Sequence, residues 1–380
     1  MKKKTPIIQR FILVLILGIL VYSCSGITKA TDIFVKPTAR ELYLRNFDSP
    51  ELVQIWEEQA DLALKDSVLV LPPYSEQGKF FPGSFPVYSY NLALNPGEKV
   101  RVEIDKDPET LVFIDLFKQT TDSLVTYEPI LSAEYGSNFL EEEISSPGIY
   151  KIVVQPEIKA VSPFKFRIET SPVYEFPVAS YGNNAIQSLW GAERDGGRRT
   201  HEGIDIFASR GTPVVATTQG RVTRTGNKGL GGKQVWLRDN KRGLSLYYAH
   251  LDSIIATPGM RVSPGDTLGL VGNTGNARTT PPHLHFGIYR SFSGAVDPFP
   301  YVFQPENSTT AKLSQEELED YLFISSGTAN LRSGPSTKFS VLTQIQARDT
   351  IKVLGKTEDW YHIRSRGRAS YIHEGLVKPL

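Results

Sequence analysis

Cysteine is almost absent from this chain of 380 residues: Cys24 is the single one, so no disulfide within the chain can help to hold it together. Net charge is nearly absent as well, because 42 lysines and arginines stand against 41 aspartates and glutamates. A chain without a global positive field is not expected to recruit nucleic acid. Any binding must therefore rest on local sites.

A long apolar run is also missing. Residues 11–22 are apolar and follow three lysines at positions 2–4, but the run is about twelve residues where a membrane-spanning helix needs roughly twenty. We therefore expect residues 1–23 to be a removable secretory signal. The segment around Cys24 resembles a bacterial lipobox, which implies cleavage before Cys24, lipidation of that residue and a membrane anchor of several acyl chains. The alternative is an ordinary secreted protein with a free thiol.

Composition indicates a mainly β chain of two to four domains, with 40% hydrophobic residues, 25 prolines and 31 glycines. Residues 49–64 are expected to form one amphipathic helix. Alternating or apolar segments bounded by turn residues predict strands. We expect residues 25–175 to form a β-sandwich-like domain that serves as a spacer, binds a partner or shields an active site. The strands are predicted at 67–71, 85–93, 100–104, 110–117, 148–154 and 163–169.

Four polar side chains recur at strand spacing near the middle of the chain. His201 and Asp205 lie four residues apart, with Gly203 between them, and His283 and His285 lie two apart. Alternation along a strand puts each pair on one face, so two paired strands could direct all four groups to one point. A catalytic zinc needs three nitrogen or oxygen ligands and an open position. The sequence therefore predicts a zinc site.

These motifs resemble the LytM/lysostaphin-type (M23) zinc metallopeptidases over residues 177–305, with His-x-x-x-Asp at 201–205, Tyr-Tyr-Ala-His-Leu at 247–251 and His-Leu-His at 283–285. The resemblance implies a β-sheet domain that holds one Zn²⁺. It also implies that the catalytic pair stands beside the water at the metal, one histidine as general base and the other as oxyanion donor, in an order left open. The implied metal ligands are His201, Asp205 and His285, and the implied catalytic residues are His250 and His283.

Residues near the motif allow further hypotheses. Asn183 or Asn184 could supply a fourth metal ligand and so inhibit the enzyme. Arg198 and Arg199 could attract an acidic peptide stem, or they could be a solvated loop pair.

The C-terminal residues 320–380 predict a small barrel after a polar linker at 306–319. Strand candidates at 341–342, 351–354, 360–363 and 370–372 alternate with turns. Asn-Leu-Arg-Ser-Gly-Pro-Ser at 330–336 and the later Trp360 resemble the bacterial SH3 domain, which implies binding of cell-wall peptide and a raised local substrate concentration. Leu331 and Trp360 are expected in the core, and His362 on the surface.

Together these features predict a zinc metalloendopeptidase that hydrolyses peptide crosslinks of peptidoglycan in the bacterial cell envelope. The expected location is the periplasmic face of the outer membrane, through the anchor at Cys24. One alternative is a silent or autoinhibited scaffold that binds the wall and activates another hydrolase, which would require a regulatory envelope protein as partner. Another is action on proteins or on a competitor's wall.

Overall fold

The computed structural model describes residues 37–45, 47–81, 83, 85–120, 125–194, 196–291, 293–305 and 318–380. The predicted signal at 1–23, the predicted lipidation site Cys24 and positions 306–317 of the predicted linker lie outside these residues. The predicted fold class is confirmed, because the described residues form several β-sheets and few helices. None of the helices within these ranges has the length and apolarity to cross a membrane.

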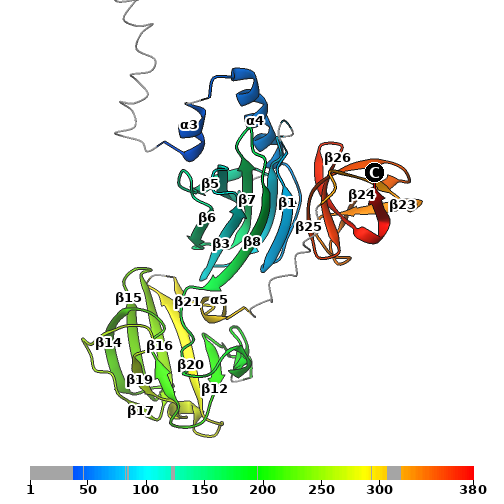
Figure 1. Cartoon of the computed structure of the whole chain (residues 1–380). Coiled ribbons are helices and arrows are strands. Elements are labelled where there is room, and N and C mark those ends of the chain that lie inside the picture. The colour runs from blue at the N-terminus through cyan, green and yellow to red at the C-terminus, as the bar shows by residue number, and fades with distance from the viewer. Residues whose placement is uncertain are drawn as a thin grey trace, which may run out of the picture.

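The N-terminal part is two β-sheets with one shared core and two helices beside them (Figure 1). Helix α4 (Pro50–Ala63) begins with proline at its first position and buries Trp56, whose indole nitrogen donates to Pro156 O at 2.8 Å. The shorter helix α3 (Ala39–Leu44) is capped by Thr38 and Glu41. One sheet has the order β2 (Tyr88–Leu94), β7 (Gly148–Pro156), β4 (Val112–Gln119), β5 (Tyr127–Ser132), and the other has the order β1 (Tyr74–Lys79), β8 (Pro163–Pro172), β3 (Glu98–Lys106), β6 (Phe139–Glu143).

Most of the predicted N-terminal elements are present, and one is wrong. Residues 67–71 do not form a named strand; Leu69 makes an isolated bridge to Asn91. The polar strand β1 was not predicted, because its sequence Tyr-Ser-Glu-Gln-Gly-Lys lacks apolar alternation. Its first five residues are nevertheless buried, and β1 pairs with β8 on one side and with β25 on the other.

The middle of the chain forms a second body, built on an eight-stranded antiparallel sheet. Strand β20 (His283–Arg290) lies at its centre between β16 (Leu244–Leu251) and β12 (Ile204–Phe207). A separate core lies beneath these strands and includes Ile206, Tyr248 and Phe286. The other strands of this sheet are β18 (Arg261–Val262), β14 (Gly220–Asn227), β15 (Lys233–Asp239), β9 (Ile186–Ser188) and β21 (Gly294–Val296).

Small elements complete this second body. A three-stranded sheet contains β13 (Pro213–Val215), β19 (Thr267–Leu270) and β17 (Ser253–Ile254). The hairpin of β10 (Glu193–Arg194) and β11 (Arg199–Thr200) stands apart from both sheets. The short helices are η1 (Asn183–Ala185), η2 (Gly275–Ala277) and α5 (Phe299–Val302).

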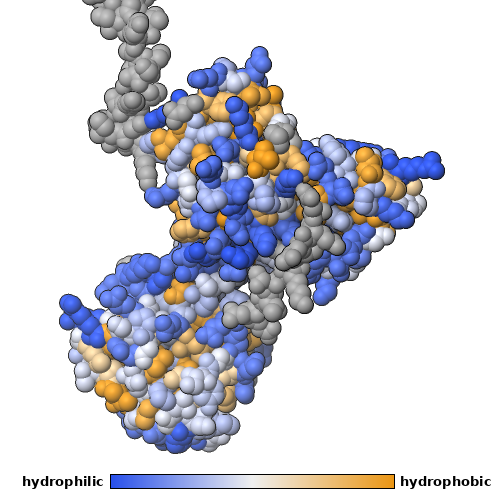
Figure 2. All heavy atoms as spheres, viewed as in Figure 1, coloured by the Kyte–Doolittle hydropathy of each residue, from blue (hydrophilic) through white to orange (hydrophobic). Residues whose placement is uncertain are grey.

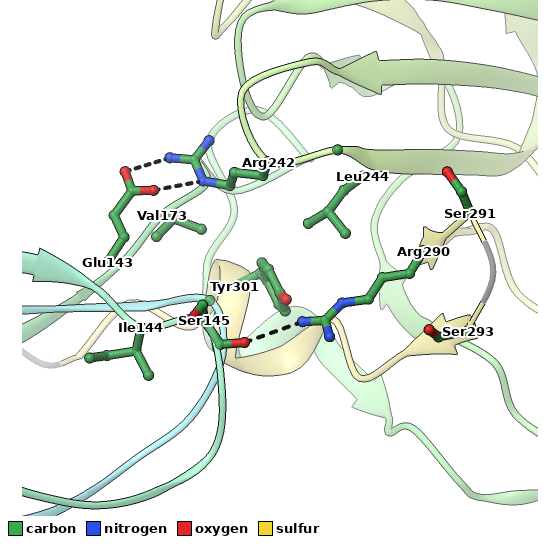
Figure 3. A pocket seen from close by; sticks show the side chains of 12 residues that line it. Glu143, Ile144, Ser145, Val173, Arg242, Leu244, Arg290, Ser291, Ser293 and Tyr301 are labelled. Atoms are coloured by element: carbon green, nitrogen blue, oxygen red, sulfur yellow. Dashed lines mark hydrogen bonds and ion pairs between the residues drawn. The ribbon is translucent and has the colours of Figure 1, made fainter. Parts of the chain in front are cut away.

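The N-terminal part and this second body meet along a polar seam. The carboxylate of Glu143 accepts from Arg242 Nη2 at 2.7 Å and from Arg242 Nε at 3.1 Å, and Arg290 Nη2 donates to Ser145 O at 3.5 Å (Figure 3). Figure 2 shows hydrophilic side chains gathered where the two parts meet on the face in view. Tyr301 of α5 also lines the pocket at this seam.

The C-terminal residues form a small β-barrel-like unit that packs beside the N-terminal part, not at a distance from it (Figure 1). Leu331 and Trp360 are buried, as predicted, but the expectation of a surface His362 is wrong, since that side chain is fully buried against N-terminal residues. The elements are β22 (Tyr321–Ile324), β23 (Thr328–Arg332), β24 (Val341–Gln346), β25 (Thr350–Thr357), β26 (Trp360–Ser365), β27 (Arg368–His373), η3 (Glu374–Leu376) and β28 (Val377–Pro379).

Candidate metal centre

Three side-chain atoms from the second body form a near-equilateral triangle. His201 Nε2, Asp205 Oδ1 and His285 Nδ1 lie 3.0 Å from one another in every pairing. Within the described ranges, the ligand atoms of these three residues lie close enough together to hold a metal ion. Zinc binds nitrogen and oxygen atoms at roughly 2.0–2.2 Å, so one ion could contact all three. The donor set fits zinc in both atom type and spacing.

Pairing of two strands creates this triangle. Asp205 on β12 stands directly opposite His285 on β20, and Ala249 on β16 flanks His285 from the other side. His201 differs from the expectation that it shares the strand of Asp205, because β12 begins only at Ile204. Instead, His201 is held by main-chain hydrogen bonds to Ala192 and Gly191, which continue the β10–β11 hairpin. The hairpin therefore delivers the first ligand and the sheet delivers the other two.

Gly203 lies between the two ligands of the first motif and leaves space for the third. A Cβ atom at this position would lie 2.7 Å from His285 Cε1, 2.8 Å from His285 Nε2 and 2.6 Å from Phe286 O. Such contacts are shorter than real Cβ atoms show. The absence of a side chain at Gly203 thus lets the His285 imidazole occupy its place in the triangle.

Outer contacts orient the predicted ligands. His201 Nδ1 lies 2.9 Å from Leu189 O, and this carbonyl can only accept a hydrogen bond. The ring proton therefore lies on Nδ1, and Nε2 keeps a lone pair for a metal. Arg194 Nη2 donates to Asp205 Oδ2 at 2.8 Å and leaves Oδ1 in the triangle. Burial alone would raise the pKa of Asp205, but the adjacent His201 and His285 side chains outweigh it and hold that pKa well below its usual range. Asp205 is therefore an anion, as a metal ligand must be.

Two further histidines face the same cleft. His250 Nδ1 lies 2.9 Å from Thr274 O, and His283 Nδ1 lies 2.9 Å from Pro281 O, so each ring has Nδ1 engaged by main chain and Nε2 available. Their ring centroids are 5.0 Å apart, and the centroid of His250 is 5.8 Å from that of His285. Burial, together with the neighbouring histidines, lowers the pKa of His250 to about 4, which keeps this ring neutral near pH 7.

The backbone of His250 is strained in a way that sequence does not reveal. Its φ of 63° lies in the left-handed region that non-glycine residues rarely adopt. Hydrogen bonds hold it there: His250 N donates to Gly231 O at 2.8 Å, and Thr274 N donates to His250 O at 3.3 Å. Strain of this kind is typical of functional sites where surrounding structure fixes an unusual conformation.

All five predicted site residues line one cleft, together with side chains that the sequence did not identify. Arg194 and the aromatic residues Tyr247 and Tyr289 are the additions, and the exposed Arg198 and Arg199 lie at the same cleft. Tyr289 could have been found, since strand alternation places it on the same face of β20 as His285, and Tyr247 of β16 lies opposite Gly287 on that face. Their rings form one aromatic group with Trp236, at centroid distances of 4.5 and 5.3 Å from it.

Asn183 does not lie at this cleft. Its side-chain oxygen accepts from Gln304 N at 3.0 Å, and its amide nitrogen donates to Gln304 O. Asn184 is likewise not among the residues that line the cleft. The hypothesis that an asparagine supplies a fourth ligand has no support in this geometry.

Comparison with known proteins agrees with the site. The model of peptidase family M23, a family of zinc metallopeptidases, matches residues 199–298, and that of the bacterial SH3 domain matches residues 327–378. The chain is 36% identical over 140 residues to an L-Ala–D-Glu endopeptidase of Bacillus subtilis. This match covers 34% of this chain and 43% of that protein. It is 38% identical over 107 residues to lysostaphin of Staphylococcus simulans, covering 27% of this chain and 21% of lysostaphin.

Among solved structures, the catalytic domain of lysostaphin from Staphylococcus simulans is 34% identical, with 31% of this chain and 92% of that domain covered and a TM-score of 0.29. The chain spans less than half the length of the two full-length relatives named above. The shared region contains every residue of the triangle and the two further histidines. Residues 199–298 therefore belong to a domain of peptidase family M23, and the chain combines this domain with a C-terminal bacterial SH3 domain.

Proposed function

We propose that this protein is a zinc-dependent endopeptidase that hydrolyses peptide bonds in peptidoglycan. The observation that carries the proposal is the triangle of His201, Asp205 and His285, with two more histidines at the same cleft. A zinc ion bound there would supply Lewis acidity, which polarises a carbonyl and makes water more acidic. The three ligands would leave one side of the ion open to the cleft, as catalytic zinc sites require.

The two other histidines, His250 and His283, would accept and donate the protons that peptide hydrolysis transfers. Each has Nδ1 engaged by a main-chain carbonyl, so each can accept or donate a proton at Nε2. His250 is neutral near pH 7 because its pKa is lowered, so its Nε2 carries a lone pair that can accept a proton. We assign the general base and the oxyanion donor to His250 and His283 as a pair.

Similarity and charge support peptidoglycan as the substrate. The relatives described above include an L-Ala–D-Glu endopeptidase and lysostaphin. The cleft carries Arg198, Arg199 and Lys228 at exposed positions, and Glu202 is the exposed acidic residue in its described lining. A basic rim would attract the carboxylates of an acidic stem peptide.

We further propose that the chain works at the cell envelope as a lipoprotein anchored through Cys24, on the periplasmic side of the outer membrane. The proposed units are the signal at 1–23, the N-terminal domain at 25–175, the peptidase at 177–305, the linker at 306–319 and the SH3 domain at 320–380. In this arrangement the wall polymer is the abundant substrate within reach of the anchored enzyme.

Digestion of purified crosslinked peptidoglycan tests the function. The protein from residue 25 to 380, without lipid, is incubated with the polymer in the presence of zinc, with a chelator, and after zinc is added back. The expected result is loss of crosslinked muropeptide dimers that stops with the chelator and returns with zinc, and mass spectrometry of the products identifies the bond. Dimers that stay intact in the zinc-loaded sample would contradict hydrolysis and favour the scaffold alternative.

A further inference from the structure

The SH3 barrel and the N-terminal part share a β-sheet. Strand β25 of the barrel pairs antiparallel with β1, with Gly355 opposite Gly78 and Lys356 opposite Gln77. The pairing joins strands that are more than 270 positions apart in sequence into one eleven-stranded sheet, with the peptidase domain inserted between them in the chain. Strand addition of this kind uses main-chain hydrogen bonds that any extended partner could otherwise take.

More hydrogen bonds extend this contact to both sides of the strand pair. Leu69 N donates to Ser333 O at 2.6 Å, and Ala369 N donates to the Asp66 carboxylate at 3.2 Å. Arg364 Nη2 donates to Val87 O at 3.0 Å. These hydrogen bonds add three segments of the barrel to β25, and each meets main chain or a buried carboxylate of the N-terminal part.

A polar cluster without access to solvent lies at the centre of the contact. Glu76 of β1 and His362 of β26 are both fully buried, with His362 Nδ1 3.0 Å from Glu76 Oε1. Tyr90 donates to the other oxygen of Glu76 at 2.9 Å, and the hydroxyls of Tyr74 and Tyr371 are 2.6 Å apart. The ring of Tyr371 stacks on His362 at a centroid distance of 4.8 Å.

The apolar packing around this cluster favours a permanent contact over a transient one. His362 Nε2 is buried without a hydrogen-bond partner among the described residues, so the polar cluster alone does not hold the barrel in place. Separation of the barrel would expose to water the apolar side chains that surround the cluster. Apolar side chains of the barrel belong to the same core as the N-terminal strands, including Leu354 and Trp360.

We propose that the SH3 barrel is a fixed partner of the N-terminal sandwich, so that residues 37–172 and 320–380 make one module into which the peptidase domain is inserted. In this module the β25 edge is occupied by β1 and is closed to wall peptide. The barrel thus has a structural role on the N-terminal part. It does not move independently of that part as a separate wall-binding unit. The proposal does not depend on peptidase activity.

Cleavage of the linker tests this proposal. A site for a specific protease is placed within residues 306–317 of the full chain, the purified protein is cut, and the products are run on gel filtration without denaturant. The barrel is expected to elute with the remainder of the chain in one peak, although denaturing electrophoresis shows two fragments. A barrel that elutes alone would overturn the proposal.

A pair of glycine substitutions ties the result to the strand contact. A Cβ at Gly355 would lie 2.2 Å from Glu76 Oε1 and 2.8 Å from Gln77 O, whereas a Cβ at Gly327 of the same barrel meets nothing within 4 Å. After cleavage, Gly355→Val is expected to release the barrel and Gly327→Val to retain it. A barrel retained by both variants would contradict the role of the β1–β25 pairing.

Hydrogen exchange shows whether the released barrel is folded. Strands β22 and β28 pair with each other within the barrel, and neither is paired with β1. In Gly355→Val their amides are expected to stay protected while those of β25 facing β1 lose protection. Loss of protection in β22 and β28 would mean that the variant has unfolded. In that case the elution of the cleaved wild-type chain decides whether the barrel stays bound to the N-terminal part.

Discussion

Substitution of Gly203 by alanine should weaken zinc binding although it replaces none of the three predicted ligands. The added Cβ would lie 2.7 Å from His285 Cε1, and ordinary contact begins near 3.4 Å, so the imidazole must move by 3.4 − 2.7, about 0.7 Å. The other close atom, Phe286 O at 2.6 Å, is main chain of the central strand and offers little relief. Zinc sites tolerate ligand displacements of roughly 0.2 Å. We therefore expect the zinc affinity to fall about 10-fold to 100-fold, the range for loss of a supporting contact, or about 1.4–2.7 kcal/mol.

Competition against a chromophoric chelator measures this affinity directly. Gly226→Ala is the matched control, because that glycine lies in β14 of the same domain, a Cβ added there would meet no atom within 4 Å, and its φ is not positive. The control is expected to bind zinc as the wild type does. If Gly203→Ala also bound zinc with the wild-type affinity, His285 would not hold zinc in the position described. That result would contradict the assignment of the triangle as a metal site.

Three further substitutions separate chemistry from metal binding and test a buried charge. His283→Ala should lower turnover by roughly 10²-fold to 10⁴-fold and leave zinc bound, whereas His201→Ala should lose the metal; both are checked by activity and metal content, and full activity of His283→Ala would refute its role. Lys151 is buried and donates to Leu64 O and Asp66 O at 2.8 and 2.6 Å, so Lys151→Met should reduce the free energy of unfolding by about 1–3 kcal/mol, measured in urea. Burial lowers the pKa of Lys151 to about 8, below its usual 10.5, so the unfolded chain binds more protons between these pH values. Wild-type stability should therefore rise by up to about 1.4 kcal/mol per pH unit from about pH 8 to 10.5, relative to Lys151→Met, and parallel profiles of the two proteins would contradict the shift.

The convergence of Asp205 and His285 was largely predictable from the sequence, since alternation along a strand places every second residue on one face. Their strands do pair, with Asp205 opposite His285, as the expectation of one strand pair requires. The position of His201 was not predictable, because it depends on main-chain hydrogen bonds to Ala192 and Gly191 in the preceding hairpin, which periodicity cannot reveal. The left-handed backbone of His250 is hidden for the same reason.

The long-range contacts were beyond reach of the sequence. Strand β1 carries Glu76 and Gln77, which indicate an exposed segment by composition, but both are buried in a strand that pairs with β8 and β25. His362 was expected on the surface because its partner Glu76 lies 286 residues earlier in the chain. Local sequence patterns indicate which face of a strand is apolar. They do not indicate which strand pairs with it, because that depends on the whole fold.

The most direct measurement compares zinc-loaded wild-type protein with zinc-loaded His283→Ala on purified crosslinked peptidoglycan, with metal content determined in each sample and muropeptides identified by mass. Loss of crosslinked dimers with the wild type, and intact dimers with a variant that still contains one zinc, is the predicted result. Equal cleavage by the two proteins, or intact dimers with both, would contradict hydrolysis at this site.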